Sequence, residues 1–120
     1  MLGASAVKQY YPKLHEEIQQ KYQFIVEFDK QGNDEFKCYD VGTPKFSRYI
    51  SQVTGFREIP AQGRRSDISM IATELCGVNL STGYYKEHHL GEYLVVEEWL
   101  RILQIALDWL QDSDLPRFKQ

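Results

Sequence analysis

The chain has 120 residues, of which 42% are hydrophobic and 13% aromatic, and it carries a formal net charge of −3. No apolar run approaches the roughly 18 residues that a membrane-spanning helix needs. Lysines and arginines are scattered among acidic residues, and Arg64-Arg65 is the one adjacent basic pair, so the basic face of a nucleic-acid-binding domain is missing. We expect a single soluble globular domain over residues 1–120 that binds neither nucleic acid nor membrane.

The two cysteines, Cys38 and Cys76, lie in apolar, strand-like segments without CxxC spacing. The first residues after Met1 lack the long apolar core of a signal peptide. These features predict a cytoplasmic protein in which both thiols are buried and free.

The segment from Ser5 to Tyr22 has the apolar spacing of a helix. Pro12 disfavours the helical conformation at Tyr11 and fits the first turn of a new helix, so we expect a break there. The apolar stripe expected on this segment consists of Val7, Tyr10, Tyr11, Leu14 and Ile18.

Two strand-like segments follow. Residues 23–28 form a nearly continuous apolar run, typical of a strand covered on both faces. Residues 35–39 alternate in polarity, which predicts a hairpin with the first strand. Asp29, directly after the first strand, is either a site residue at a strand's carboxyl end or the start of a polar turn. The local pattern alone favours the turn.

A helix is predicted between Thr43 and Gly55. Thr43 is a good N-cap, Pro44 fits the first turn, and Gly55 ends the helix. Its buried stripe consists of Phe46, Tyr49, Ile50 and Val53. A short strand is expected over residues 56–59.

In the second half, Ser66 is placed to cap a helix that continues to about Leu75, with Asp67 in the first turn, where the helix dipole favours a negative charge. Residues 76–80 are the next strand. An amphipathic helix begins at Val96, and residues 112–120 form a polar tail that we expect to fray. The core side of this helix is predicted to carry Trp99, Ile102, Leu103, Ala106 and Leu110. Helices alternating with apolar strands predict an α/β layered domain.

The stretch from Asn79 to Glu92 holds two of the three histidines, and Glu92 follows His88 by four residues. Imidazole and carboxylate are usual zinc ligands outside thiolate sites. Adjacent histidines in a polar loop are more often solvated, and Gly91 disfavours the helix that would direct His88 and Glu92 to one ion. The residue pattern alone leaves both interpretations open.

Other catalytic patterns lack support. There is no serine-hydrolase elbow, phosphate-binding glycine loop or HExxH sequence. A thiol nucleophile at Cys76 is disfavoured because this residue opens a buried strand.

Five segments, in order, resemble the C-terminal part of the catalytic domain of zinc-dependent exopeptidases, the superfamily of bacterial aminopeptidases, tripeptidase T and glutamate carboxypeptidase. These segments are Gly3–Val7, Phe24–Gly32, Gly63–Asp67, Gly77–Tyr85 and His88–Tyr93. The resemblance covers nearly the whole chain. It implies the second half of a zinc-exopeptidase domain, a partial three-layer αβα sandwich.

The resemblance also implies roles for single residues. Asp29 and His88 match positions that bind zinc in the family, and Glu92 matches the glutamate four residues after that histidine. The resemblance thereby favours Asp29 as a site residue rather than as the start of a turn. It also favours His88 rather than His89 as the zinc ligand. Supporting or pocket positions are Ser66, Asp67, Gly83, Tyr84 and Tyr85.

Essential parts of the family's site have no counterpart in this sequence: a His-x-Asp segment, a bridging aspartate and a Glu-Glu pair. His15 is not followed by the required x-Asp. In the family, one glutamate of the pair is the general base on a zinc-bound water, whose pKa the metal lowers to about 7. The resemblance therefore implies the C-terminal portion of a peptide hydrolase, from an internal start, a split gene or a truncation, and inactive alone.

A second hypothesis is a non-catalytic interaction module. Half of a sheet leaves an unpaired edge and uncovered apolar faces, which promote pairing with another chain. Self-association, or assembly with a separately encoded N-terminal half, would cover both.

Overall fold

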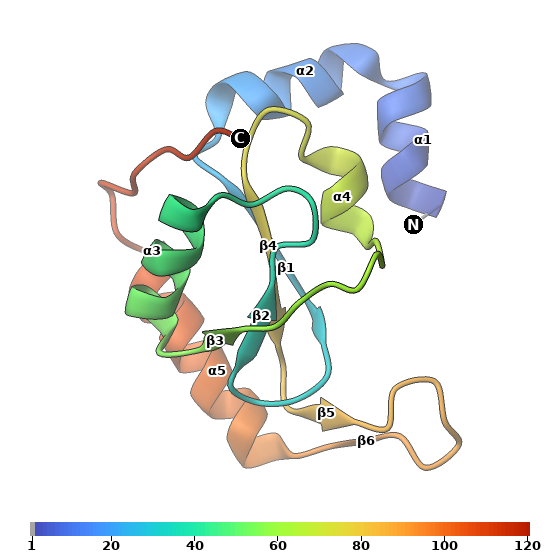
Figure 1. The fold of residues 1–120 in the computed structure, drawn as a ribbon, viewed down its shortest axis with the longest axis vertical. Coiled ribbons are helices and arrows are strands. Elements are labelled where there is room, and N and C mark those ends of the chain that lie inside the picture. Colours follow the sequence, from blue (N-terminus) through green and yellow to red (C-terminus); the bar gives the residue numbers. More distant parts are fainter. Residues whose placement is uncertain (1) are drawn as a thin grey trace.

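The protein is a mixed α/β domain, seen in a computed structural model that describes residues 2–120 (Figure 1). Its helices are α1 (Leu2–Tyr10), α2 (Pro12–Lys21), α3 (Pro44–Thr54), α4 (Asp67–Ile71) and α5 (Val96–Leu110). Its strands are β1 (Ile25–Lys30), β2 (Glu35–Lys37), β3 (Arg57–Glu58), β4 (Gly77–Ser81), β5 (Tyr84–Tyr85) and β6 (Tyr93–Leu94). Within residues 2–120, no helix combines the length and apolar character needed to cross a membrane.

The main sheet has the strand order β1-β4-β2-β3, and β5 pairs with β6 in a separate hairpin. β1 is parallel to β4, and β2 is antiparallel to β4 and parallel to β3. The predicted hairpin of β1 with β2 is therefore wrong, because β4 lies between them. β4 takes the inner position since all its residues are buried, whereas β1 has exposed residues and lies at the edge.

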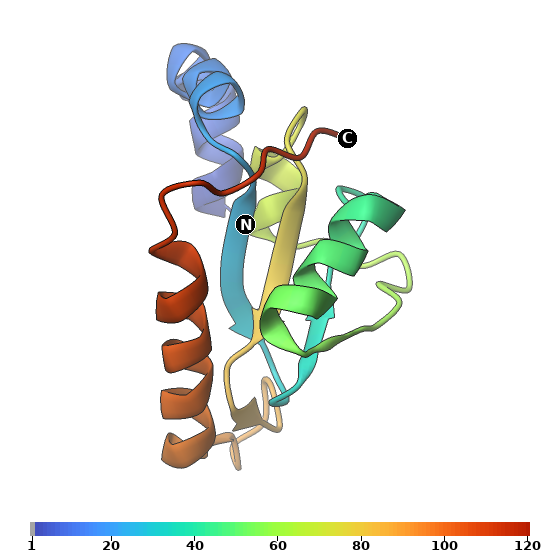
Figure 2. The ribbon, with the colours of Figure 1, turned by 90° about the vertical axis from the view of Figure 1, so that its left-hand side faces the viewer.

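Helices cover both faces of the sheet. Figure 2 looks onto the face that carries α3 and α5, with α1 and α4 behind the sheet. Side-chain alternation along the strands explains this division. Val26 and Val78 pack in the main core with residues of α3 and α5, whereas Ile25 packs against Ile68 of α4 on the opposite face. The domain therefore has three layers.

Helix α3 follows its prediction. The Thr43 hydroxyl accepts a hydrogen bond from the Phe46 N–H at 3.1 Å, and Gly55 ends the helix in the left-handed conformation with φ 74°. Phe46 and Ile50 are fully buried. Both cysteines are also buried and free, as expected.

The break at Tyr11 is confirmed, but the apolar stripe predicted across it is wrong. Tyr10, Tyr11 and Leu14 are exposed, and the buried residues of α1 and α2 are Ala4 and Gln19. Because the chain turns between the helices (Figure 1), the two halves of the stripe no longer share one face.

Gln19 also accounts for the short helix α4. Its side-chain oxygen accepts hydrogen bonds from the N–H groups of Thr73, Glu74 and Leu75 at 3.0–3.2 Å, and its amide donates to the Ile71 carbonyl at 2.7 Å. These backbone groups are thereby satisfied outside a helix, so α4 ends at Ile71 rather than at Leu75.

The predicted fraying after α5 is wrong as well. Phe118 is buried, its N–H donates to the Gln23 carbonyl, and its own carbonyl accepts from the Cys76 N–H, both at 2.9 Å. The Phe118 ring centroid lies 4.8 Å from that of Tyr49. Arg117 also donates to the carbonyls of Gln19, Gln20 and Tyr22, and Gln120 donates to those of Ala72 and Leu75. The buried Phe118 ring and these hydrogen bonds together hold the segment against the domain.

Helix α5 begins where it was predicted, but its buried side differs. Ile102, Ala106 and Trp109 are buried, whereas Trp99 and Leu103 remain 41% and 39% exposed. A second apolar stripe on α5, formed by Val96, Leu100, Leu103 and Leu107, faces solvent. We call these four residues the α5 stripe.

Candidate functional site

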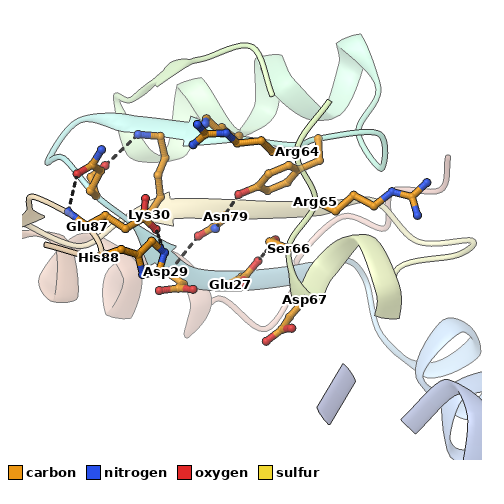
Figure 3. Close-up of a pocket in the computed structure, with 13 residues that line it drawn as sticks. Glu27, Asp29, Lys30, Arg64, Arg65, Ser66, Asp67, Asn79, Glu87 and His88 are labelled. Atoms are coloured by element: carbon orange, nitrogen blue, oxygen red, sulfur yellow. Dashed lines mark hydrogen bonds and ion pairs between the residues drawn. The ribbon is translucent and has the colours of Figure 1, made fainter. Parts of the chain in front are cut away.

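A polar cavity of about 320 Å³ lies on the α4 face of the sheet (Figure 3). Its walls come from the end of β1, from β4, from the segments around β2 and α4, and from the connection between β5 and β6. The lining residues are Glu27, Asp29, Lys30, Gln31, Lys37, Tyr39, Arg64, Arg65, Ser66, Asp67, Asn79, Glu87 and His88. Segments distant in sequence thus contribute charged groups to one space.

An irregularity in β1 holds Asp29 in this cavity. The register between β1 and β4 shifts between Glu27 and Lys30. At this bulge, the Asn79 side-chain oxygen accepts a hydrogen bond from the Asp29 N–H at 2.9 Å. The Asn79 amide donates to the Tyr39 hydroxyl at 3.1 Å. Buried Asn79 therefore joins both walls of the cavity and positions the Asp29 backbone.

Asp29 itself lies in a negative environment. Partial burial raises the pKa of its carboxyl, and the nearby carboxylates of Glu87 and Asp67 raise it further. Asp29 lies within β1, so the interpretation as the first residue of a turn is wrong. The raised pKa means that the ionised form is poorly compensated by the protein alone. Binding of a cation would relieve this cost.

Glu27, two residues earlier on β1, lines the same cavity as Asp29. The Ser66 hydroxyl donates a hydrogen bond to its carboxylate. Burial raises the pKa of Glu27, and the Ser66 hydrogen bond partly offsets this effect. The predicted cap residue Ser66 is therefore also a partner of the cavity wall, next to Asp67.

The β5–β6 hairpin carries His88 to the cavity. The rings of Tyr85 and Tyr93 stack with centroids 5.3 Å apart. The Tyr85 hydroxyl donates to Glu98 of α5, which raises the pKa of Tyr85 to about 12. Gly83 precedes the hairpin with φ 85°, and a Cβ there would lie 3.0 Å from the Trp99 backbone nitrogen. Gly83 and Tyr85 therefore support the hairpin rather than line the cavity.

His88 lies in a tight turn and faces solvent. It adopts φ 63°, and its side chain is 89% exposed. The Glu92 carboxylate accepts a hydrogen bond from the His88 N–H at 3.1 Å. Glu92 thus supports His88 through the backbone, while the imidazole Nε2 lies 3.6 Å from the Glu87 carboxylate.

A second cavity of about 440 Å³ adjoins the same residues. It is lined by Phe28, Asp29, Thr82, Tyr84, Glu87, His88 and Glu92. The Tyr84 hydroxyl lies 3.1 Å from the Glu87 carboxylate and 3.2 Å from the Asp29 carbonyl, and burial raises its pKa. The structure therefore brings together Asp29, His88 and Glu92, whereas His89 lines a different cavity.

These residues do not form a preassembled metal centre. Among residues 2–120, no group of three or more His, Cys, Asp or Glu side chains is arranged to hold a metal ion.

Sequence reasoning missed several residues of the site, among them Glu27, Lys37, Tyr39, Asn79 and Glu87. Two signals were available. Glu27 and Asp29 are an alternating acidic pair in an apolar strand, and Asn79 is a lone amide in the apolar run of residues 76–80. Lys37, Tyr39 and Glu87 carry no local signal, because only the fold brings them to the cavity.

No family model, curated protein or solved structure matches this chain.

Proposed function

We propose that this chain supplies part of a divalent-metal site of the zinc-exopeptidase type and does not hydrolyse peptides by itself. One observation carries the proposal. Asp29 of β1 and His88 of the β5–β6 connection, which are remote in sequence, line the same two cavities. A carboxylate and an imidazole are ligands that zinc prefers in catalytic sites.

The donors fit zinc in type but fall short in number. Zinc sites use three or four protein ligands, and Asp29 and His88 are the two that this chain would contribute. When bound, zinc would supply a Lewis acid and lower the pKa of a water molecule to about 7. The neighbouring carboxylate of Glu87 is engaged by the Tyr84 hydroxyl. We therefore propose that the remaining ligands and the general base come from another polypeptide.

Within this half-site, the chain's own residues position the two donors. Asn79 binds the backbone N–H of Asp29, and Glu92 binds the backbone N–H of His88. Both contacts act on the backbone, so neither of them engages the carboxylate of Asp29 or the imidazole of His88.

A hydrolysis assay tests the catalytic part of this proposal. Purified protein with added zinc is incubated with dipeptides and tripeptides, and released amino acids are measured. We expect no release above that of a His88→Ala variant. Zinc-dependent release by the unmodified protein that is lost in His88→Ala and kept in His89→Ala would contradict the claim of inactivity.

A separate observation favours a second function, self-association. β1 is at the edge of the sheet, and Phe28 near its end is 44% exposed. The α5 stripe residues are 39% to 58% exposed. A strand edge beside an apolar helix face is a typical site for pairing with another chain. A second copy of the chain presents the same strand edge and the same α5 stripe, so a two-fold axis would bring the two edges and the two stripes into contact.

Light scattering over a range of protein concentrations tests self-association. The unmodified protein should form dimers, and Leu103→Glu should shift it to monomers by placing a charge in the contact. Leu2→Glu is the control, since Leu2 is 91% exposed on α1, away from the stripe. A monomer at every concentration would exclude a second copy as the partner.

A further inference from the structure

The charges in the main cavity are separated into two walls. Figure 3 shows Arg64 on the opposite side of Asn79 from Glu27, Asp29 and Asp67. Arg64 and Lys37, whose positive charges lie near each other, form the basic wall. The acidic wall would repel an anion, so any anionic group in the cavity must lie against the basic wall.

The basic wall has donors that the protein itself leaves unused. Lys30 is paired with Glu35 at 2.7 Å, and the same carboxylate also pairs with Arg57 at 2.6 Å. Over residues 2–120, by contrast, the side chains of Lys37 and Arg64 have no hydrogen bond or ion pair. Partial burial lowers the pKa of Lys37, and the positive charges of Lys30 and Arg64 lower it further. A carboxylate bound between Lys37 and Arg64 would offset the repulsion between their positive charges.

Tyr39 adds a third donor beside these two cations. Its hydroxyl oxygen accepts a hydrogen bond from Asn79, and in the described part of the chain its own hydrogen has no acceptor. Tyr39 also adopts φ 52°, which is rare for a bulky residue. Such conformations persist only where the surroundings enforce them, and they cluster at functional sites. His88, on another wall, has a positive φ as well.

We propose that Lys37, Arg64 and the Tyr39 hydroxyl form a subsite for the carboxylate of a small ligand. This inference rests on the proposed function in one respect, which is that the other end of the ligand would lie near Asp29 and His88. A cavity of about 320 Å³ is at the small end of ligand sites. A carboxylate suits it better than a phosphate, because a dianion would meet stronger repulsion from the acidic wall.

An NMR titration without metal, in the presence of a chelator, tests the subsite. The probes are N-acetyl-alanine, with one α-carboxylate, N-acetyl-glutamic acid α-amide, with one side-chain carboxylate, and neutral N-acetyl-alanine amide. We expect at least one of the two acids to shift the Tyr39 and Asn79 signals at about 20 mM ligand. This concentration is high enough to detect a complex with a dissociation constant in the millimolar range. The acid that binds identifies the source of the carboxylate.

Variants make the result specific. Lys37→Met and Arg64→Gln should each weaken binding of that acid about tenfold, as expected for loss of one charge-assisted hydrogen bond. Arg48→Gln is the matched control, because Arg48 is exposed on α3 and lies outside the cavity. Dispersed NMR spectra of each variant show that it is folded.

Two results would overturn the subsite: equal binding of the amide and the acids, or binding that Lys37→Met and Arg64→Gln leave unchanged. Absence of any shift at the highest ligand concentration would overturn it as well. Because the titration contains no metal, failure of the zinc half-site would leave its outcome unaffected, and failure of the subsite would leave zinc binding unaffected.

Discussion

Asn79→Ala is the perturbation that most directly tests how the fold builds the site. Asn79 is 1% exposed in the middle of β4. Its side chain makes two hydrogen bonds, accepting from the Asp29 N–H at 2.9 Å and donating to the Tyr39 hydroxyl at 3.1 Å. Alanine would remove both and leave a space beneath the cavity.

The magnitude follows from these contacts. Each lost hydrogen bond costs about 1 kcal/mol, and an unsatisfied buried partner costs about 1–3 kcal/mol. We therefore expect the free energy of unfolding to fall by about 2–3 kcal/mol, within the range of buried polar substitutions. For a domain of this size, that corresponds to a decrease in Tm of about 10 °C.

Urea denaturation gives the stability change, and amide hydrogen exchange reports the local effect. The Asp29 amide should lose its protection in Asn79→Ala, because its acceptor is gone. Asn33→Ala is the matched control, since Asn33 makes a single side-chain hydrogen bond, to Glu98 at 2.8 Å. A loss no larger than that of the control, with the Asp29 amide still protected, would refute the positioning role of Asn79.

Three further predictions concern the surroundings. Gln19→Ala removes four hydrogen bonds to the 71–75 segment and should lower the free energy of unfolding by about 2–4 kcal/mol in urea; a loss under about 1 kcal/mol would contradict this role. Asp29 has a pKa raised above its usual 3.8, so the folded state loses stability as pH rises from the unfolded to the folded pKa. Asp29→Asn should therefore be a few tenths of a kcal/mol more stable at neutral pH, and not below pH 3.8, in denaturation curves across pH. Burial raises the pKa of Cys38 to about 12, so a thiol reagent should label Cys38 only after unfolding, and rapid labelling of the native protein would be inconsistent with its burial.

Elements with strong local signals were predictable from the sequence. The cap at Thr43, the proline after it and the terminal Gly55 define α3 within a few residues of chain. The break at Pro12 and the buried run of β4 are likewise local features. In each case the deciding interaction is between neighbours in sequence, so pattern and propensity suffice.

What depended on distant contacts was not predictable. The order of strands follows from the burial of β4 between β1 and β2, and a period-two pattern in β2 fits either neighbour. The early end of α4 depends on the side chain of Gln19, and the docking of the C-terminal segment depends on Arg117, Phe118 and Gln120. Gln19, Arg117 and Gln120 fit an ordinary polar helix or tail pattern, and a single aromatic residue such as Phe118 does not mark a docked segment.

The residues of the candidate site also divide into those that the sequence could identify and those that it could not. Asp29, His88 and Glu92 could be named through the resemblance to a family, and the fold places all three along one cavity. Lys37 could not be named, because only the folded chain brings it to the cavity beside Arg64.

The most direct test of the half-site is a zinc titration followed by NMR. Zinc added to the unmodified protein should shift the His88 imidazole and Asp29 carboxyl signals with a dissociation constant weaker than about 10 μM, since two ligands hold zinc poorly. Asp29→Asn should abolish the shift of the His88 imidazole signal, and His88→Gln should abolish the shift of the Asp29 carboxyl signal. His89→Gln should leave both shifts unchanged. Binding at nanomolar zinc, or binding indifferent to Asp29 and His88, would contradict the proposal that this chain supplies one incomplete side of a metal site.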